Sequence, residues 1–123
     1  MYCFTWPIFD IIGNNFGIHG FRKIRIDRQN EASRRQYRQY GYPHADMDRI
    51  YDVLSEYTEV SVDWMRVKEY EIQLELDALV ANRTMLEIYR YAKNKGKRVV
   101  ATSDMYLFAD TLYKALEKNG YGD

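Results

Sequence analysis

The stretch that decides the fold class is KRVVATSD, residues 97–104. Two basic residues open it, and a short apolar, β-branched run leads into three small polar residues. Runs of this length and composition, bounded by turn-forming residues, are typical of a buried β-strand. The sequence therefore predicts one strand over residues 97–102, which ends at Thr102, Ser103 and Asp104.

Helical patterns flank this strand on both sides. One pattern ends before Gly96, and another covers residues 107–119 before Gly120. Helix, glycine, strand, polar turn and helix together indicate an α/β unit, which we place at residues 83–123. One strand cannot form a sheet, because its backbone groups need paired neighbours. We expect those neighbours to lie outside the chain or in a second copy, which would give a homodimer through the exposed strand.

Residues 1–82 are predicted to be purely helical. Four helices are expected, and the most clearly marked covers residues 21–40, before Gly41. The residues expected to cap the first, third and fourth helices are Thr5, Asp46 and Ser61. The first helix is expected to end near residues 13–15 and the fourth near Ala81. The expected fold class is thus mainly α: a helical bundle followed by a partial α/β unit with one strand.

Basic and acidic residues separate between these helices. Residues 21–40 contain seven Lys or Arg and two acidic residues, whereas residues 46–77 contain ten acidic and three basic residues. The helices either pack together through complementary charge or each use the charge to solvate an outer face. Both interpretations stay open, because exposed ion pairs contribute little stability.

The chain as a whole is neutral, with 18 basic and 18 acidic groups among 123 residues. This balance argues against nucleic acid and anionic membranes as partners. No apolar run is long enough to span a membrane, and the N-terminus lacks the pattern of a signal peptide. Cys3 is the single cysteine and has no partner for an intrachain disulfide, which fits a reducing compartment. We expect a cytoplasmic protein.

Thr102, Ser103 and Asp104 form the most site-like group in the sequence. In open α/β sheets, ligands bind beyond the carboxyl ends of the strands, and the start of a following helix favours an anion. A serine hydroxyl at this point can donate to a phosphate oxygen. The simpler interpretation is that Ser103 or Asp104 only caps the following helix. The spacing alone leaves both interpretations open.

The run VVATSDMYL, residues 99–107, resembles the second motif of the haloacid dehalogenase superfamily. In that motif an apolar strand ends in a Ser or Thr that binds the transferred phosphoryl group, and Ser103 stands at the matching position. The segments WPIFD (residues 6–10) and GFRKIR (residues 20–25) resemble the start of the helical cap in a bacterial subgroup that often accompanies glycosyltransferases.

This resemblance implies a helical cap at residues 1–82 and part of a Rossmann-like core at residues 83–123. For the intact enzyme it implies magnesium-dependent hydrolysis of a phosphorylated small molecule or sugar phosphate, through an aspartyl-phosphate. Ser103 would hold the phosphoryl oxygens, with Thr102 and Asp104 beside it.

The chain departs from the family at the catalytic positions. The family's nucleophile lies in an Asp-x-Asp-x-Thr/Val motif before the cap, and we expect it upstream of Met1. Asp10 is not a match, because Ile12 replaces the second aspartate, and a helical position is predicted for it. The later basic and acidic motifs are expected beyond Asp123. We therefore assign no catalytic residue and no metal ligand here, and predict that this chain alone is inactive.

Other polar groups are predicted to be structural. His19 and His44 lack the spacing of metal ligands, and Glu69, Glu71 and Glu75 lack the Glu-x-x-His pattern of di-iron bundles. The three glutamates are expected on a solvated face.

Two further expectations concern function. A family cap shapes substrate access, so the resemblance makes Arg22, Arg25 or tyrosines of residues 1–82 candidates for substrate contact. The alternative function is a non-enzymatic helical module that self-associates or binds a partner.

Overall fold

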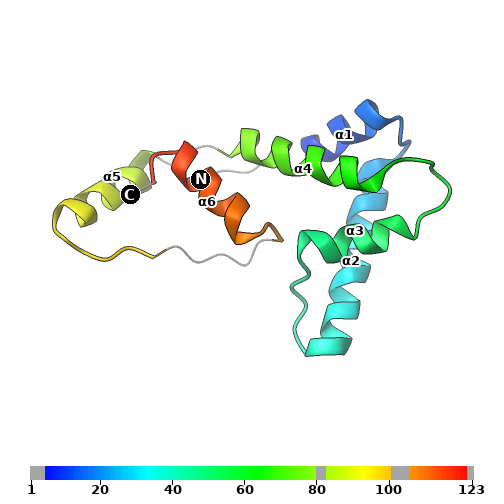
Figure 1. The fold of residues 1–123 in the computed structure, drawn as a ribbon, viewed down its shortest axis with the longest axis horizontal. Helices are drawn as coiled ribbons and strands as arrows, with labels where there is room; N and C mark the ends of the chain where they lie inside the picture. Colours follow the sequence, from blue (N-terminus) through cyan, green and yellow to red (C-terminus); the bar gives the residue numbers. More distant parts are fainter. Residues whose placement is uncertain (1–4, 80–82, 101–105, 122–123) are drawn as a thin grey trace.

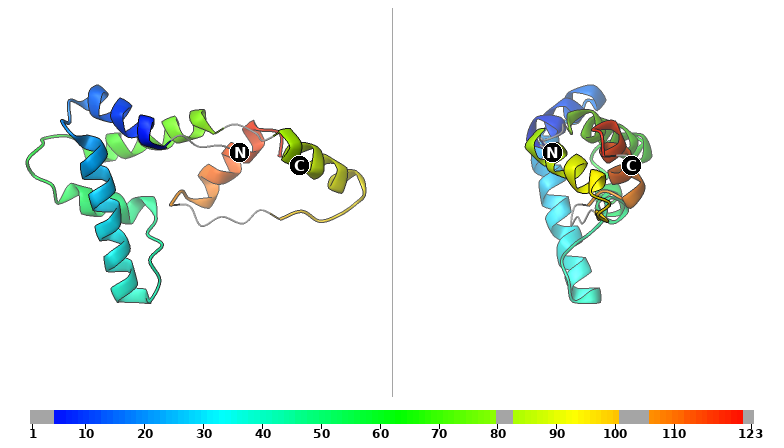
Figure 2. Two further views of the ribbon diagram at one scale, coloured as in Figure 1. Left: turned by 180° about the vertical axis from the view of Figure 1, so that it is seen from behind. Right: turned by 90° about the vertical axis from the view of Figure 1, so that its left-hand side faces the viewer.

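The computed structural model of the protein describes residues 5–79, 83–100 and 106–121. Within these ranges the regular structure is entirely helical (Figure 1). The helices are α1 (Thr5–Phe16), α2 (Phe21–Tyr40), α3 (Met47–Ser55), α4 (Trp64–Ala78), α5 (Arg83–Asn94) and α6 (Ala109–Lys118). The molecule is elongated, with α1 to α4 gathered at one end, α5 at the other and α6 between them (Figures 1 and 2).

The first four helices enclose the main hydrophobic core. α1 packs on α2 and α4, and α3 packs on α2 and α4. The core residues that are almost completely buried are Phe9, Ile12, Phe21, Met47, Ile50, Leu54 and Val67. On α1 and α3 they recur at helical spacing, and burial of these apolar side chains drives the assembly.

The helix over Phe21–Tyr40 is confirmed at both ends. Gly20 and Gly41 flank it in left-handed conformations, with φ of 70° and 80°, and Gly41 N–H donates to the Tyr37 carbonyl at 2.8 Å. Glycine takes this conformation without the steric cost that other residues meet. The sequence therefore marks both ends of α2 locally.

The first helix ends at Phe16, one residue beyond the predicted end near residues 13–15, and Gly13 lies inside it. A Cβ atom at Gly13 would lie 2.9 Å from Phe21 Cβ and 3.0 Å from the Ile18 carbonyl oxygen. The missing side chain lets α1 approach the start of α2 closely. This glycine serves packing, and the chain leaves the helix at Gly17, with φ of 67°.

Two predicted caps can be compared with the structure. Asp46 does cap α3, since its carboxylate accepts from Arg49 N–H at 2.9 Å. The cap of α4 is Asp63 and not Ser61, because the Asp63 carboxylate accepts from Met65 N–H at 3.1 Å. Both residue types suit the position, and the sequence offered two within three residues. α4 ends at Ala78, and the predicted end at Ala81 lies outside the described residues.

The predicted strand at residues 97–102 is wrong wherever the structure describes it. Residues 97–100 have no regular structure and are exposed, and residues 101 and 102 lie outside the described ranges. No sheet forms in the described part of the chain, so a partial α/β unit with one strand is not present there. A β-branched run favours a strand only if a neighbouring strand receives its backbone hydrogen bonds, and none of the described residues provides one.

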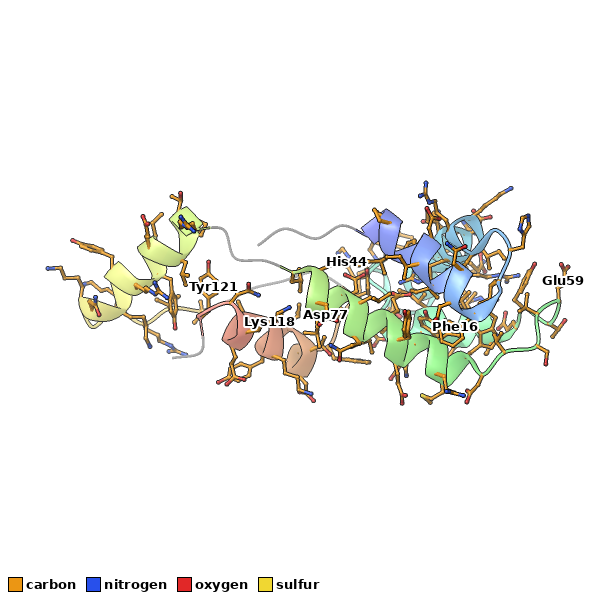
Figure 3. All side chains as sticks on the ribbon, turned by 90° about the horizontal axis from the view of Figure 1, so that it is seen from above. Phe16, His44, Glu59, Asp77, Lys118 and Tyr121 are labelled. Carbon is orange, nitrogen blue, oxygen red and sulfur yellow. The ribbon has the colours of Figure 1, made fainter. Side chains whose placement is uncertain are left out.

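The C-terminal residues return to the bundle. α6 packs on α4, and Lys118 Nζ donates to the Leu76 carbonyl at 2.8 Å, close to the labelled Asp77 in Figure 3. α5 packs on no other described helix, and it meets the end of the chain, where Tyr89 hydroxyl donates to the Tyr121 carbonyl at 3.2 Å. None of the described helices has both the length and the apolar character needed to cross a membrane.

Candidate functional site: a buried charged cluster in the helical bundle

A complete ion pair lies at the centre of the bundle. Arg25 on α2 and Glu71 on α4 are both 0% exposed. Arg25 Nε donates to Glu71 Oε1 and Arg25 Nη2 donates to Glu71 Oε2, each at 2.8 Å. This planar, two-pronged arrangement is the strongest geometry available to an arginine and a carboxylate. The pair joins α2 to α4 through two residues that are 46 positions apart in the sequence.

The remaining donor groups of Arg25 are also engaged. Its Nη1 donates to Gln29 Oε1 at 2.7 Å, one turn further along α2. The guanidinium carbon lies 4.8 Å from the ring centre of Phe9, 5.2 Å from that of Tyr106 and 5.9 Å from that of Tyr51. Aromatic faces attract a cation and partly replace the water that it has lost. The positive charge of Arg25 is therefore surrounded by a carboxylate, an amide oxygen and aromatic rings.

Two tyrosines supply hydroxyl donors to the glutamates. Tyr51 hydroxyl donates to Glu71 Oε1 at 2.7 Å, and Tyr106 hydroxyl donates to Glu75 Oε1. Glu75 lies one turn beyond Glu71 on α4 and is also 0% exposed. The main chain adds a further link, because Met47 N–H donates to the Tyr106 carbonyl at 2.8 Å. Residue 106 is thus attached to both α3 and α4.

The electrostatics of the cluster keep its donors protonated. Burial by itself lowers the pKa of Arg25, but the charge and hydrogen bonds of Glu71 outweigh it, and the pKa ends above its ordinary value. Burial, followed by the neighbouring negative charge, raises the pKa of Tyr51 beside Glu71 and the pKa of Tyr106 beside Glu75. Both hydroxyls therefore keep the protons that they donate at neutral pH.

The expectation of a solvated glutamate face is wrong for two of its three residues. Glu69 is exposed, but Glu71 and Glu75 are fully buried. They share one stripe of α4 with Val67, at intervals of four residues. The signal was present in the sequence, since two carboxylates stand on an otherwise apolar stripe. Their partner Arg25 could not be identified, because nothing local connects it to them.

The opposite charges of the helices do meet across the bundle. Besides the buried pair, Arg35 on α2 donates from Nη1 and Nη2 to the two carboxylate oxygens of Glu56 at 2.7 and 2.8 Å. Lys68 Nζ donates to Asp48 Oδ1 at 2.6 Å, joining α4 to α3. Complementary packing is therefore realised, although the last two pairs are exposed and contribute little each.

The residues singled out from the sequence lie in several places. Thr102, Ser103 and Asp104 lie outside the described residues. Asp10 is on α1, as predicted, and pairs with Arg22. The two histidines, of which His44 is labelled in Figure 3, are exposed and lie in the connections between helices. Of the two arginines considered for substrate contact, Arg22 is bound to a carboxylate at the surface and Arg25 is enclosed.

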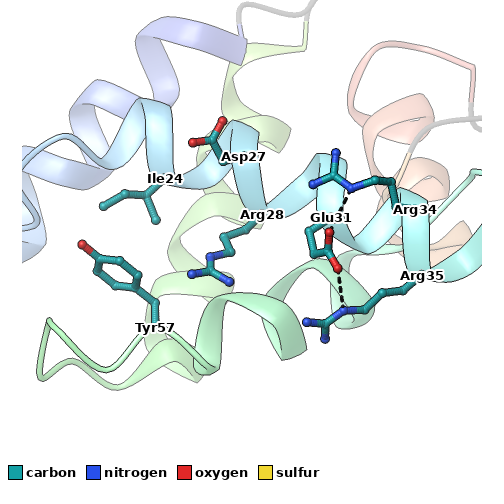
Figure 4. A pocket seen from close by; sticks show the side chains of 7 residues that line it. All are labelled: Ile24, Asp27, Arg28, Glu31, Arg34, Arg35 and Tyr57. Atoms are coloured by element: carbon teal, nitrogen blue, oxygen red, sulfur yellow. Dashed lines mark hydrogen bonds and ion pairs between the residues drawn. The ribbon is translucent and has the colours of Figure 1, made fainter.

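A hollow of about 420 Å³ lies on the outer side of α2, beside Tyr57 (Figure 4). Arg28 stands 5.7 Å from the centre of the Tyr57 ring, and Arg34 and Arg35 both donate to Glu31, at 2.9 and 3.1 Å. The residues that line it are Ile24, Asp27, Arg28, Glu31, Arg34, Arg35 and Tyr57. The three arginines of the lining are balanced by the carboxylates of Asp27 and Glu31 in the lining and by that of Glu56, which pairs with Arg35. The hollow therefore has no excess of positive charge that would define an anion site.

Neither known proteins nor the arrangement of possible metal ligands assigns a function to the buried cluster. The chain matches no protein-family model and none of the curated proteins with which it was compared. Among the described residues, no group of three or more His, Cys, Asp or Glu side chains is placed to hold a metal ion.

Proposed function

We propose that this chain is the helical cap and second-motif part of a haloacid-dehalogenase-like phosphohydrolase. In the intact enzyme the activity would be magnesium-dependent hydrolysis of a phosphorylated small molecule or sugar phosphate. Ser103 would bind the phosphoryl oxygens, with Thr102 and Asp104 beside it. The support comes from the resemblance of residues 99–107 to the phosphate-binding motif and from that of residues 6–10 and 20–25 to the cap.

One structural observation carries the proposal further. Residues 5–79 form four helices around the Arg25–Glu71 pair, and Tyr106 and Leu107 complete their core. A cap must keep its shape beside the catalytic core, and a bundle with a continuous core that also holds the end of the second-motif segment supports this role. The bundle leads within four residues from Leu79 to Arg83, where the segment with the Ser103 motif begins.

The chain by itself is proposed to be inactive. The chemistry of the family needs a nucleophilic aspartate, and this sequence contains no Asp-x-Asp-x-Thr/Val motif. A serine hydroxyl alone can orient a phosphate but forms no aspartyl-phosphate. We also propose a cytoplasmic location, which the single cysteine supports.

The test uses two proteins. The chain of 123 residues and a longer product of the adjoining coding sequence are each assayed with an aryl phosphate and magnesium ions. We expect turnover from the longer product only, its loss in Ser103→Ala and partial recovery in Ser103→Thr, which keeps the hydroxyl. Turnover by the shorter chain that Ser103→Ala abolishes would refute its inactivity. A longer product that is folded but inactive, or an adjoining sequence without the nucleophile motif, would refute membership of this enzyme class.

A further inference from the structure

Exposed apolar side chains concentrate in the C-terminal third of the chain. Twelve large hydrophobic residues are exposed among the described ones, and seven of them belong to residues 83–121. Four of these define what we call the α5 surface: Ile88 (55% exposed) and Tyr91 (66%) on α5, with Val99 (42%) and Val100 (69%) in the irregular segment that follows it. α5 is also a described helix without a buried residue. Surfaces of this kind mark sites where another macromolecule binds.

The contacts that α5 does make leave this surface uncovered. Leu86 lies against Gly120, and the Tyr89 ring centre is 5.1 Å from that of Tyr121. The two side chains belong to the part of α5 that meets the end of the chain. Ile88 and Tyr91 remain more than half exposed beside them.

Charge restricts what can cover the α5 surface. Residues 83–100 contain six Lys or Arg and one Glu, so their net charge is +5. Because the whole chain is neutral, the other residues carry a net charge of −5. A second α5 surface would bring two strongly basic segments together, which costs free energy. The acidic part of a second copy has the complementary charge.

That acidic part also has an apolar hollow. Between α3 and α4 lies a hollow of about 390 Å³, which we call the α3–α4 hollow. Met65 on its rim is 57% exposed. The residues that line the hollow are Asp48, Tyr51, Asp52, Ser55, Trp64, Met65 and Lys68. Tyr51, Trp64 and Met65 give the hollow an apolar part, while Asp48, bonded to Lys68, and Asp52 also line it. Residues 46–77 around the hollow carry a net charge of −7, so a partly apolar hollow in an acidic segment matches an apolar surface in a basic one.

We propose that two copies of this chain associate in an antiparallel dimer, in which the α5 surface of each docks on the α3–α4 hollow of the other. α5 lies at one end of the long axis, and α3 with the first turns of α4 lies towards the other (Figures 1 and 2). One two-fold axis across the long direction therefore closes both contacts at once. The dimer does not depend on the proposed enzyme function, and its test measures mass instead of turnover.

The test is the molar mass by light scattering and sedimentation over about a hundredfold range of concentration. We expect the mass to rise towards that of a dimer, and less so at high salt. Removing the apolar contact in Ile88→Ser with Tyr91→Ser should weaken the dimer about tenfold or more. Ile11→Ser is the matched control, because Ile11 on α1 is 46% exposed and lies outside both surfaces. A wild-type chain that stays monomeric throughout would overturn the proposal.

Charge exchange tests the pairing itself. Variant one carries Lys95→Glu, Lys97→Glu and Arg98→Glu, which change the net charge of residues 83–100 from +5 to −1. Variant two carries Asp48→Lys and Asp52→Lys on the lining of the hollow. Each variant alone should dissociate, because both of its contacts become repulsive. An equimolar mixture should dimerise, because one contact is then charge-reversed on both sides and the other is wild type. Dimers in either variant alone, or no recovery in the mixture, would contradict this docking, and circular dichroism checks that each variant is folded.

Discussion

Arg25 and Glu71 form two hydrogen bonds of 2.8 Å between side chains that are both completely buried, and they lie 46 residues apart in the sequence. This pair links α2 to α4 across the core, although each of these helices packs on α1 and α3 and not on the other. Tyr51 from α3 donates to the same carboxylate, so three of the four bundle helices meet at one charged group. The contribution of the pair to stability can be measured.

Breaking the pair from one side should be costly. Arg25→Ala or Glu71→Ala leaves the other charge buried without its partner, and we expect a loss of about 3 to 5 kcal/mol in the free energy of unfolding. The double variant Arg25→Met with Glu71→Leu removes both charges and should lie closer to the wild type than either single variant. Urea unfolding followed by circular dichroism measures all three.

The matched control is the exposed pair of Arg35 and Glu56, whose side chains are 43% and 49% exposed. Arg35→Ala should cost no more than about 1 kcal/mol. Equal losses for Arg25→Ala and Arg35→Ala would show that the buried pair has no special role.

Tyr106 should contribute through its hydroxyl as well as its ring. Tyr106→Phe keeps the ring against Arg25 but removes the donor to buried Glu75, and we expect it to cost about 1 to 3 kcal/mol. Tyr113→Phe on α6 is the control, because Tyr113 is 57% exposed, and should change stability by less than about 0.5 kcal/mol. The comparison uses the same urea unfolding curves. Indistinguishable midpoints for the two variants would argue against the buried hydrogen bond.

Gly13→Ala should destabilise the protein although alanine favours helices. Helix propensity alone would stabilise the variant by about 1 kcal/mol. The new Cβ atom would lie 2.9 Å from Phe21 Cβ, so α1 and α2 must move apart, and we expect a net loss of about 1 to 3 kcal/mol. Asn14→Ala, at an exposed position next to it in α1, should be neutral or stabilising. A raised thermal midpoint for Gly13→Ala would show that the helices are not in close contact here.

Acid should weaken the outer ion pairs of α2. Hydrogen bonds from Arg34 and Arg35 lower the pKa of Glu31, and those from Arg35 lower the pKa of Glu56. A carboxyl group whose pKa is lower in the folded state stabilises it above the unfolded pKa, about 4.5. That contribution is lost as the pH falls through the folded pKa. We therefore expect the urea midpoint to fall as the pH is lowered from about 5 to about 3.

The variant Glu56→Gln isolates one of these groups. Its urea midpoint should depend less steeply on pH over the same interval than that of the wild type, and high salt should shrink the difference. Parallel curves for the two proteins would mean that Glu56 does not contribute to the acid sensitivity.

Local signals account for the parts of the fold that were predicted correctly. Gly20 and Gly41 mark the two ends of α2, and Asp46 caps α3. A left-handed glycine or a side-chain cap depends only on residues within one turn of the helix end, so the local sequence predicts it. The errors fall where distant residues decide. The local sequence at Gly13 predicts a helix end, whereas in the structure this glycine lets α1 approach Phe21. The composition of residues 97–100 predicts a strand, but no described residue pairs with them.

The helical character of residues 5–79, most helix ends and the separation of basic α2 from acidic α3 and α4 follow from the sequence alone. Which charges are buried depends on the tertiary structure, because the apolar stripe of α4 marks Glu71 and Glu75 but no local signal connects Arg25 to them. Burial depends on which faces meet, and that choice is made by contacts between residues far apart in the chain. The same reason explains residues 97–100, where β-branched residues favour a strand, but a strand forms only where a neighbouring strand pairs with it.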